Sequence, residues 1–253
     1  MTVQNQKVVL ILGSAPSALA CRDWARETIT DIVAINNAWR VRPDWDYLIH
    51  PEDFPEDRHP ETTDAHQQII TAADYVPLQN QLGGFVYAGG TMAFTAGYWA
   101  LAALRPQVLA FWGCDMVYAD SGNTHFYGTG ASDPLRADVT LRSLEAKSAR
   151  LGLIAARLGC ACVNLSDQPS RLVFPHLSRA DLPNAQPIPR ARAAALSAGP
   201  EADEKRLDYR VPSGRYWEVE SRFNPTYIDA LDAKWLAAWK TACDDDSSIR
   251  QSA

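Results

Sequence analysis

A chain of 253 residues, 47% hydrophobic and 21% charged, has an ordinary globular composition and is long enough for one sizeable core. Its net charge of -6 argues against a protein that coats nucleic acid, which needs a basic surface, although backbone amides can still hold a small anionic ligand. No apolar run approaches the roughly eighteen residues of a membrane-spanning helix, so we expect no transmembrane segment and a cytoplasmic protein.

The N-terminal part of the chain alternates apolar runs with helix signals. Residues 8–12 (VVLIL) form a continuous aliphatic run, which predicts a strand buried on both faces. The run ends at Gly13, and Pro16 suits the first turn of a following helix. Further strands are predicted over 32–35 and 47–49.

The next segment is dense in proline and acidic residues. Residues 51–64 predict a solvated loop, or a lid over a site. Beyond it we expect a helix over 65–75, an extended piece over 84–88 and a second helix over 91–104.

The central part of the chain continues the alternation, with a strand over 108–112, a long loop, a helix over 138–158 and a strand over 162–165. Strands that alternate with helices imply right-handed crossover units and a parallel sheet. The fold class that we expect is therefore α/β. It is a Rossmann-like, doubly wound, mainly parallel sheet with helices on both faces, plus a C-terminal helical extension.

Composition divides the chain into three parts. We place a Rossmann-like nucleotide-binding domain over 1–182, a linker or irregular arm rich in Ala, Pro and Arg over 183–206, and a C-terminal helical extension over 207–253. Trp235 and Trp239 stand four residues apart and so share one helix face. We expect this face to pack on the core or on a second subunit, so a homo-oligomer through the aromatic segment is one interpretation.

Small and hydrogen-bonding residues follow the predicted strands. Ligands of doubly wound sheets bind at the carboxyl ends of the strands, so these residues are expected to share one rim of the sheet. A turn-forming role explains any one of them but explains the whole set less well. The candidate nucleotide contacts are Gly13, Ser14, Ser17, Asn36, Asn37, His50, Gly89, Gly90, Thr91 and Tyr118.

Two helix starts on that rim favour an anion. Ser14 and Ser17 stand at the first, and Gly89, Gly90 and Thr91 at the second, where backbone amides and the helix dipole attract phosphate. The first turn lacks the second glycine of the dinucleotide fingerprint and the lysine of a P-loop. A nicotinamide enzyme and a classical ATPase are therefore disfavoured.

The stretch FWGCDMVYADSGNTHFYG, residues 111–128, combines a buried strand with side chains that do chemistry. Asp115 at the strand end could hold a hydroxyl, bind a metal or cap a turn. His125 could act as a general base at neutral pH, or lie on the surface. We expect Asp115 and His125 to be the catalytic residues and this loop to be the floor of the site.

Four stretches resemble a known family: ILGSAPSA, AINNAW, LIHPED and GGTMAFTAGYWALAALRPQVLAFWGCDMVYADSGNTHF. Over residues 8–165 the chain resembles the family that joins MptE-like pterin pyrophosphokinases with motility-associated glycosyltransferase-like proteins (domain of unknown function 115). It is similar, more distantly, to bacterial sialyltransferases of glycosyltransferase family 42. The block from Gly89 to His125 carries the most specific part of the resemblance.

The sialyltransferase resemblance implies a Rossmann-like domain that binds a CMP-sugar without a metal held by a DxD motif. The nucleotide contacts that it implies are Gly13, Ser14, Asn36, His50, Gly90 and Thr91. The chain departs from these enzymes at Ser14, where they carry asparagine, and at His125, which follows its strand at a shorter distance than their catalytic histidine. The spacing from Asp115 to His125 matches the MptE-like proteins better, and there the implied reaction is pyrophosphoryl transfer from ATP to a pterin alcohol.

The function that we expect is transfer of a sugar from a nucleotide, with a CMP-sugar as the favoured donor, to a hydroxyl of a saccharide acceptor. No cofactor is firmly implied. The alternative is an ATP-dependent pyrophosphokinase, which would need Mg²⁺ with Asp115 and Asp120 as ligands. Its candidate cationic groups are Arg136, Arg142 and Arg171. A third interpretation is a non-catalytic nucleotide-binding relative, because a fold does not settle function.

Overall fold

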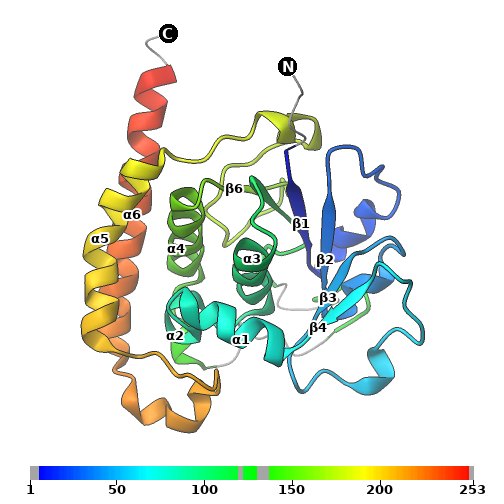
Figure 1. Ribbon diagram of the computed structural model, residues 1–253, viewed down its shortest axis with the longest axis horizontal. Coiled ribbons are helices and arrows are strands. Elements are labelled where there is room, and N and C mark those ends of the chain that lie inside the picture. Colours follow the sequence, from blue (N-terminus) through cyan, green and yellow to red (C-terminus); the bar gives the residue numbers. More distant parts are fainter. Residues whose placement is uncertain (1–5, 119–121, 130–136, 251–253) are drawn as a thin grey trace.

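A parallel sheet forms the centre of the computed structural model, which describes residues 6–118, 122–129 and 137–250. Its six strands lie in the order β4-β3-β2-β1-β5-β6, and all neighbouring pairs are parallel (Figure 1). The strands are β1 (Val8–Leu12), β2 (Asp31–Ile35), β3 (Tyr47–Ile49), β4 (Gln68–Ile70), β5 (Val108–Trp112) and β6 (Ala161–Asn164). The predicted Rossmann-like α/β fold with C-terminal helices is confirmed.

Helices of two kinds lie between these strands and after β6. The α-helices are α1 (Ala72–Gln81), α2 (Phe85–Ala88), α3 (Met92–Ala103), α4 (Leu144–Arg157), α5 (Arg190–Leu207) and α6 (Pro225–Arg250). The 3-10 helices are η1 (Pro16–Cys21), η2 (Asn36–Arg40), η3 (Glu56–Arg58), η5 (Val139–Leu141), η6 (Arg179–Asn184) and η7 (Tyr216–Arg222). The helix predicted over 91–104 is α3, and the one predicted over 138–158 is divided into η5 and α4.

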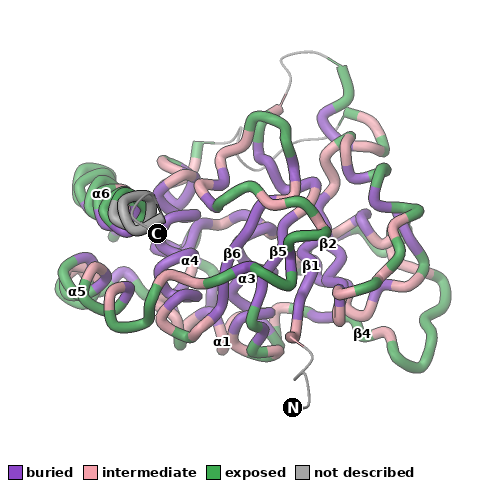
Figure 2. The backbone as a smooth tube through the Cα atoms, turned by 90° about the horizontal axis from the view of Figure 1, so that it is seen from above, coloured by how far each residue is buried: buried purple, intermediate pink, exposed green. Residues whose placement is uncertain are grey.

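The two faces of the sheet bury their side chains in two separate cores. Side chains alternate along a strand, so Val9 and Ile11 of β1 enter one core, and Leu10 and Leu12 enter the other. The first core is completed by α-helices, including α3 and α4, and the second by the short helices η1, η2 and η6. Figure 2 shows the central strands β1, β2, β5 and β6 as buried.

Two short elements differ from the sequence prediction. The helix expected over 65–75 is instead the edge strand β4 followed by α1, because Ile69 and Ile70 pair with Leu48 and Ile49 of β3. Helix α1 begins at Ala72. Thr71 caps this helix, and its backbone N donates to Asp74 Oδ2 at 2.8 Å. The segment expected to be extended over 84–88 is the short helix α2.

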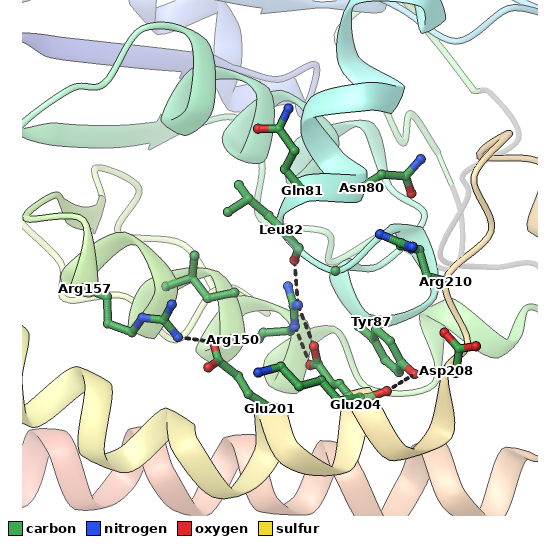
Figure 3. A pocket seen from close by; sticks show the side chains of 13 residues that line it. Asn80, Gln81, Leu82, Tyr87, Arg150, Arg157, Glu201, Glu204, Asp208 and Arg210 are labelled. Carbon is green, nitrogen blue, oxygen red and sulfur yellow. Dashed lines mark hydrogen bonds and ion pairs between the residues drawn. The ribbon is translucent and has the colours of Figure 1, made fainter.

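The segment predicted as a linker or irregular arm over 183–206 is largely helical. Its alanines favour helix, and a buried ion pair fixes helix α5 to the core. Arg150 of α4 donates to both carboxylate oxygens of Glu204, at 2.7 and 2.8 Å (Figure 3). Arg150 also donates to Tyr98 Oη at 2.6 Å, and Trp235 Nε1 donates to Glu204 at 2.9 Å. Composition alone did not reveal this partner for Glu204.

The long helix α6 packs its aromatic face on the core. Trp235 is 1% exposed, and Trp239 contacts Phe174 at 6.1 Å between ring centroids. A Cβ on Gly152 of α4 would lie 2.3 Å from the Trp239 ring, so glycine makes room for that ring. The expected packing of this face on the core is confirmed. In the part of the chain that the structure describes, no helix is both long and apolar enough to cross a bilayer.

Candidate functional site

The carboxyl ends of β1 and β5 form the point where the connections of the sheet change direction. Strands β2, β3 and β4 lie on one side of β1, and β5 and β6 lie on the other. Gly13 N donates to Trp112 O at 2.8 Å, and a Cβ on Gly13 would lie 2.2 Å from Gly113 O, so glycine is required there. Doubly wound folds bind their ligands in the crevice at such a switch point.

A cavity of about 160 Å³ lies at this point, and we call it the switch-point cavity. Six residues predicted from the sequence line it: Gly13, Ser14, Asn36, Thr91, Tyr118 and His125. Its wall also includes residues that are not among the predicted nucleotide contacts or catalytic residues: Ala15, Ile35, Pro51, Met92, Ala93, Gly113, Cys114, Met116, Val117 and Tyr127. The fold thus brings together the ends of β1, β2, β3 and β5 with the start of α3.

The loop after β5 folds back over the turn that follows β1. Phe126 N donates to Ser14 O at 3.0 Å, which ties the loop to that turn. His125 and Gly128 exchange backbone hydrogen bonds at 3.0 and 3.1 Å and close a small turn. These bonds hold His125 at the wall of the cavity.

His125 is held in an environment that favours its neutral form. The residue is 9% exposed, and burial lowers the pKa of its imidazole below the ordinary value. Its Nδ1 lies 2.9 Å from the Thr124 hydroxyl, and its ring stacks on Tyr127 with centroids 4.9 Å apart. A neutral, oriented histidine can accept a proton at neutral pH.

Buried hydrogen-bond acceptors without a partner gather at the ends of β2 and β3. They are Asn36 Oδ1, Asn37 Oδ1 and His50 Nε2, for which no donor is present in the described residues. His50 Nδ1 lies 2.9 Å from Pro51 O, and a carbonyl can only accept, so Nδ1 carries the proton. Burial lowers the pKa of His50, which leaves Nε2 as an unprotonated acceptor.

The N-terminus of α3 faces the switch-point cavity. The Thr91 hydroxyl accepts from Phe94 N at 3.3 Å and caps the helix, and Met92 and Ala93 line the cavity. The first amides of a helix have no acceptor within that helix and attract anions. Met92 and Ala93 could have been predicted as cavity residues from the sequence, because they directly follow the helix cap Thr91.

Asp115, expected to be catalytic, does not line the switch-point cavity. It is 5% exposed, and its carboxylate accepts from Ser166 Oγ at 2.9 Å and from Asn164 Nδ2 at 3.4 Å. Its backbone oxygen accepts from Arg171 N at 2.9 Å. Asp115 therefore joins the end of β5 to the segment after β6, which is a positioning role.

Five other predicted residues do not line the cavity. Asn37 and His50 directly adjoin the lining residues Asn36 and Pro51 in the chain. Gly90 N donates to Thr140 Oγ1 at 3.0 Å, so this amide is already used inside the protein. The other two are Ser17, which lies in η1, and Gly89, which follows the last residue of α2 and has a φ of 91°.

Of the groups named for the pyrophosphokinase alternative, those that the structure describes, namely Asp115, Arg142 and Arg171, do not line the cavity. Asp120 and Arg136 lie outside the described residues. Arg142 pairs with Asp229 at 2.6 Å and Arg171 pairs with Glu145 at 2.5 Å. Over residues 6–118, 122–129 and 137–250, no three His, Cys, Asp or Glu side chains are placed to hold a metal ion.

Comparison with known proteins gives no assignment. No family model matches the chain, and no curated protein or solved structure matches it significantly. The interpretation of the cavity rests on its geometry and on the residues that carry the sequence resemblance.

Proposed function

We propose that the protein is a glycosyltransferase that binds a CMP-sugar in the switch-point cavity and transfers the sugar to a hydroxyl of a saccharide. The observation that carries the proposal is the meeting of His125 with the N-terminus of α3 at the ends of β1 and β5. His125 provides a base and the helix N-terminus provides an anion site. Transfer from a nucleotide-sugar uses both.

An unpartnered acceptor at the end of β2 supports a cytidine nucleotide. Asn36 lines the cavity, its Oδ1 has no donor in the described residues, and an unpaired buried acceptor costs about 1–3 kcal/mol. Cytosine offers its exocyclic amino group, where uracil carries an oxygen. The ribose adds hydroxyl donors. Adenine also carries an amino group, so ATP is the nucleotide against which CMP must be tested.

In the proposed reaction each group at the cavity has one task. The amides of Met92 and Ala93 hold the phosphate, and His125 takes the proton of the acceptor hydroxyl. The hydroxyl oxygen bonds to the anomeric carbon, the bond from that carbon to the phosphate oxygen breaks, and CMP leaves with the electron pair. Tyr118 and Tyr127 flank His125, with ring centroids at 5.9 and 4.9 Å, and offer hydroxyls to the leaving phosphate.

The position of Asp115 favours glycosyl transfer over the pyrophosphokinase alternative. A metal ligand at this position would have to turn its carboxylate toward the nucleotide. Both oxygens instead accept hydrogen bonds from Asn164 and Ser166, away from the cavity lining. Pyrophosphoryl transfer would also call for cationic groups at the phosphates, and no described Arg or Lys lines the switch-point cavity.

A nucleotide-binding experiment tests the proposal. Thermal unfolding is followed with CMP, CDP, UDP, GDP and ATP, each with Mg²⁺ or with EDTA. A ligand at a hundred times its dissociation constant stabilises the native state by about 2.7 kcal/mol. We expect stabilisation by CMP in both buffers. Stabilisation by ATP with Mg²⁺ alone would replace the proposal by the pyrophosphokinase, and no stabilisation by any nucleotide would overturn nucleotide binding at this cavity.

Two variants link this binding to the cavity. Asn36 has a φ of 51°, so Asn36→Gly removes the amide while keeping an allowed backbone, and we expect a roughly tenfold weaker affinity for CMP. Asp208→Gly is the matched control, because Asp208 has a φ of 49° and ends α5 outside the cavity. His125→Gln should retain CMP binding but slow release of CMP from CMP-sialic acid, with an acceptor present, by about 10²–10⁴-fold.

A further inference from the structure

A second, larger cavity adjoins the switch-point cavity. It has a volume of about 570 Å³ and lies between the segment after β3, helices α1 and α3, and residues 213–220 of the C-terminal part. Pro51 and Met92 line both cavities, so the two share a wall. A second substrate held in the larger cavity would therefore lie beside a nucleotide held in the smaller one.

Aromatic rings form one side of this larger cavity, and we call it the aromatic cavity. Tyr75 and Phe85 are in edge contact at 6.2 Å, and Phe85 stacks with Tyr216 at 6.5 Å between centroids. Trp217 packs its edge against Tyr216 at 5.4 Å and remains 59% exposed. An exposed tryptophan at the rim of a cavity offers a flat apolar face to a ligand.

The charged groups of the aromatic cavity are mostly carboxylates. Four acidic residues line it, namely Glu52, Asp53, Asp138 and Glu220, against one cationic residue, Arg215. Arg215 is itself engaged, at 3.2 Å from Glu52. The electrostatic potential in the cavity is therefore negative, and it disfavours a ligand that carries a negative charge.

We infer that the aromatic cavity is the acceptor site and that it takes an uncharged or amine-bearing saccharide. Carboxylates accept hydrogen bonds from sugar hydroxyls or ammonium groups, and the apolar face of a pyranose ring can pack on Trp217. A sugar that carries a carboxylate or sulfate is repelled. The inference rests on the proposed function, because it identifies the acceptor class of the same reaction.

The acceptor then completes the reaction across the shared wall. Its hydroxyl loses a proton to His125 as its oxygen bonds to the anomeric carbon, and CMP leaves as already described. Pro51 and Met92 line both cavities and therefore border both substrates. The C-terminal segment 213–220 therefore takes part in acceptor recognition, although the nucleotide site is built without it.

Saturation-transfer NMR tests this inference on the full chain, with CMP present. The probes are methyl glycosides of galactose, glucose, N-acetylglucosamine, glucosamine and glucuronic acid. We expect saturation of at least one neutral or amine-bearing glycoside and at least threefold weaker saturation of the glucuronide. In Trp217→Ala the glycoside signals should fall at least threefold. Tyr227→Ala is the matched control, because Tyr227 is 54% exposed on α6 and does not line the cavity.

The signals of CMP in the same samples separate the two proposals. CMP signals without any glycoside signal would overturn the acceptor site and leave the nucleotide site. Glycoside signals that survive in Trp217→Ala, or a glucuronide signal as strong as the others, would also overturn the acceptor site. If CMP gave no saturation-transfer signals with the native protein, the proposed function would be overturned instead.

Discussion

Asn36 and Met116 carry unusual backbone conformations at the switch-point cavity. Their φ values are 51° and 53°, in the left-handed region. Asparagine tolerates this region, but for methionine it is strained, and such strain costs about 1–3 kcal/mol. Strained residues tend to be retained where a ligand site requires their geometry. The strain at Met116 thus agrees with its place in the cavity wall.

The two histidines at the site make stability depend on pH. Burial lowers the pKa of His50 and of His125 in the folded protein below the ordinary 6.5. As pH falls below 6.5, the unfolded chain binds these protons before the folded chain does, so acid favours unfolding. We expect the free energy of unfolding to fall between pH 6.5 and 5, with a slope of at most about 1.4 kcal/mol per pH unit for each histidine.

Urea unfolding at a series of pH values measures this slope. His125→Gln should reduce the slope, because the variant has no proton to bind at that position. His66→Gln is the control, since His66 lies exposed on the surface. An unchanged slope in His125→Gln would show that this ring does not resist protonation in the folded state.

Single residues also show how far the sequence could predict the site. Gly13, Ser14 and Asn36 were found by the rule that ligands bind at strand ends, and the parallel sheet places them together. Asp115 satisfied the same rule, yet its carboxylate turns toward Asn164 and Ser166, 49 and 51 residues away in the chain. Local sequence carries no signal of such distant hydrogen-bond partners.

Among the elements, the buried central strands were predicted best, whereas the edge strand β4 and helix α5 were missed. The buried strands β1 and β5 can be recognised in the sequence as apolar runs, because a parallel strand covered on both faces has no polar side. Helix α5 lacks an apolar face of that clarity, and its place in the fold depends on tertiary contacts to α4 and α6. The pair Arg150 and Glu204 is one of these contacts, with side chains only 2% and 8% exposed.

Loss of the arginine in this pair should therefore be costly. Arg150→Met leaves Glu204 buried without its cation, and we expect a loss of about 3–5 kcal/mol in the free energy of unfolding. The double variant Arg150→Met with Glu204→Leu removes both charges and should recover part of that loss. Urea denaturation at pH 7 measures both values.

An exposed pair at the start of α4 gives the matched control. Arg142 and Asp229 lie 2.6 Å apart with side chains 40% and 49% exposed, so Arg142→Met should cost no more than about 1 kcal/mol. Similar losses in Arg150→Met and Arg142→Met would contradict an anchoring role for the buried pair.

In the whole molecule, the C-terminal helices share a core with the sheet. The hydrophobic cluster that includes Val9 and Ile11 of β1 also includes Trp235 and Trp239 of α6. Figure 1 shows α5 and α6 side by side against α4, on the side of the sheet that carries the α-helices. A cluster that spans these layers makes their unfolding mutually dependent.

We therefore expect the sheet and α6 to unfold in one cooperative transition. Native-state hydrogen exchange should give amides in β1 and in the middle of α6 the same free energy of opening, because neither layer keeps a covered core without the other. Trp235→Ala, which empties a fully buried position, should lower both values together by about 3–5 kcal/mol. If α6 instead opened at much lower free energy while β1 stayed protected, the C-terminal extension would be a separate folding unit. Acceptor recognition by residues 213–220 could then be lost without loss of the nucleotide site.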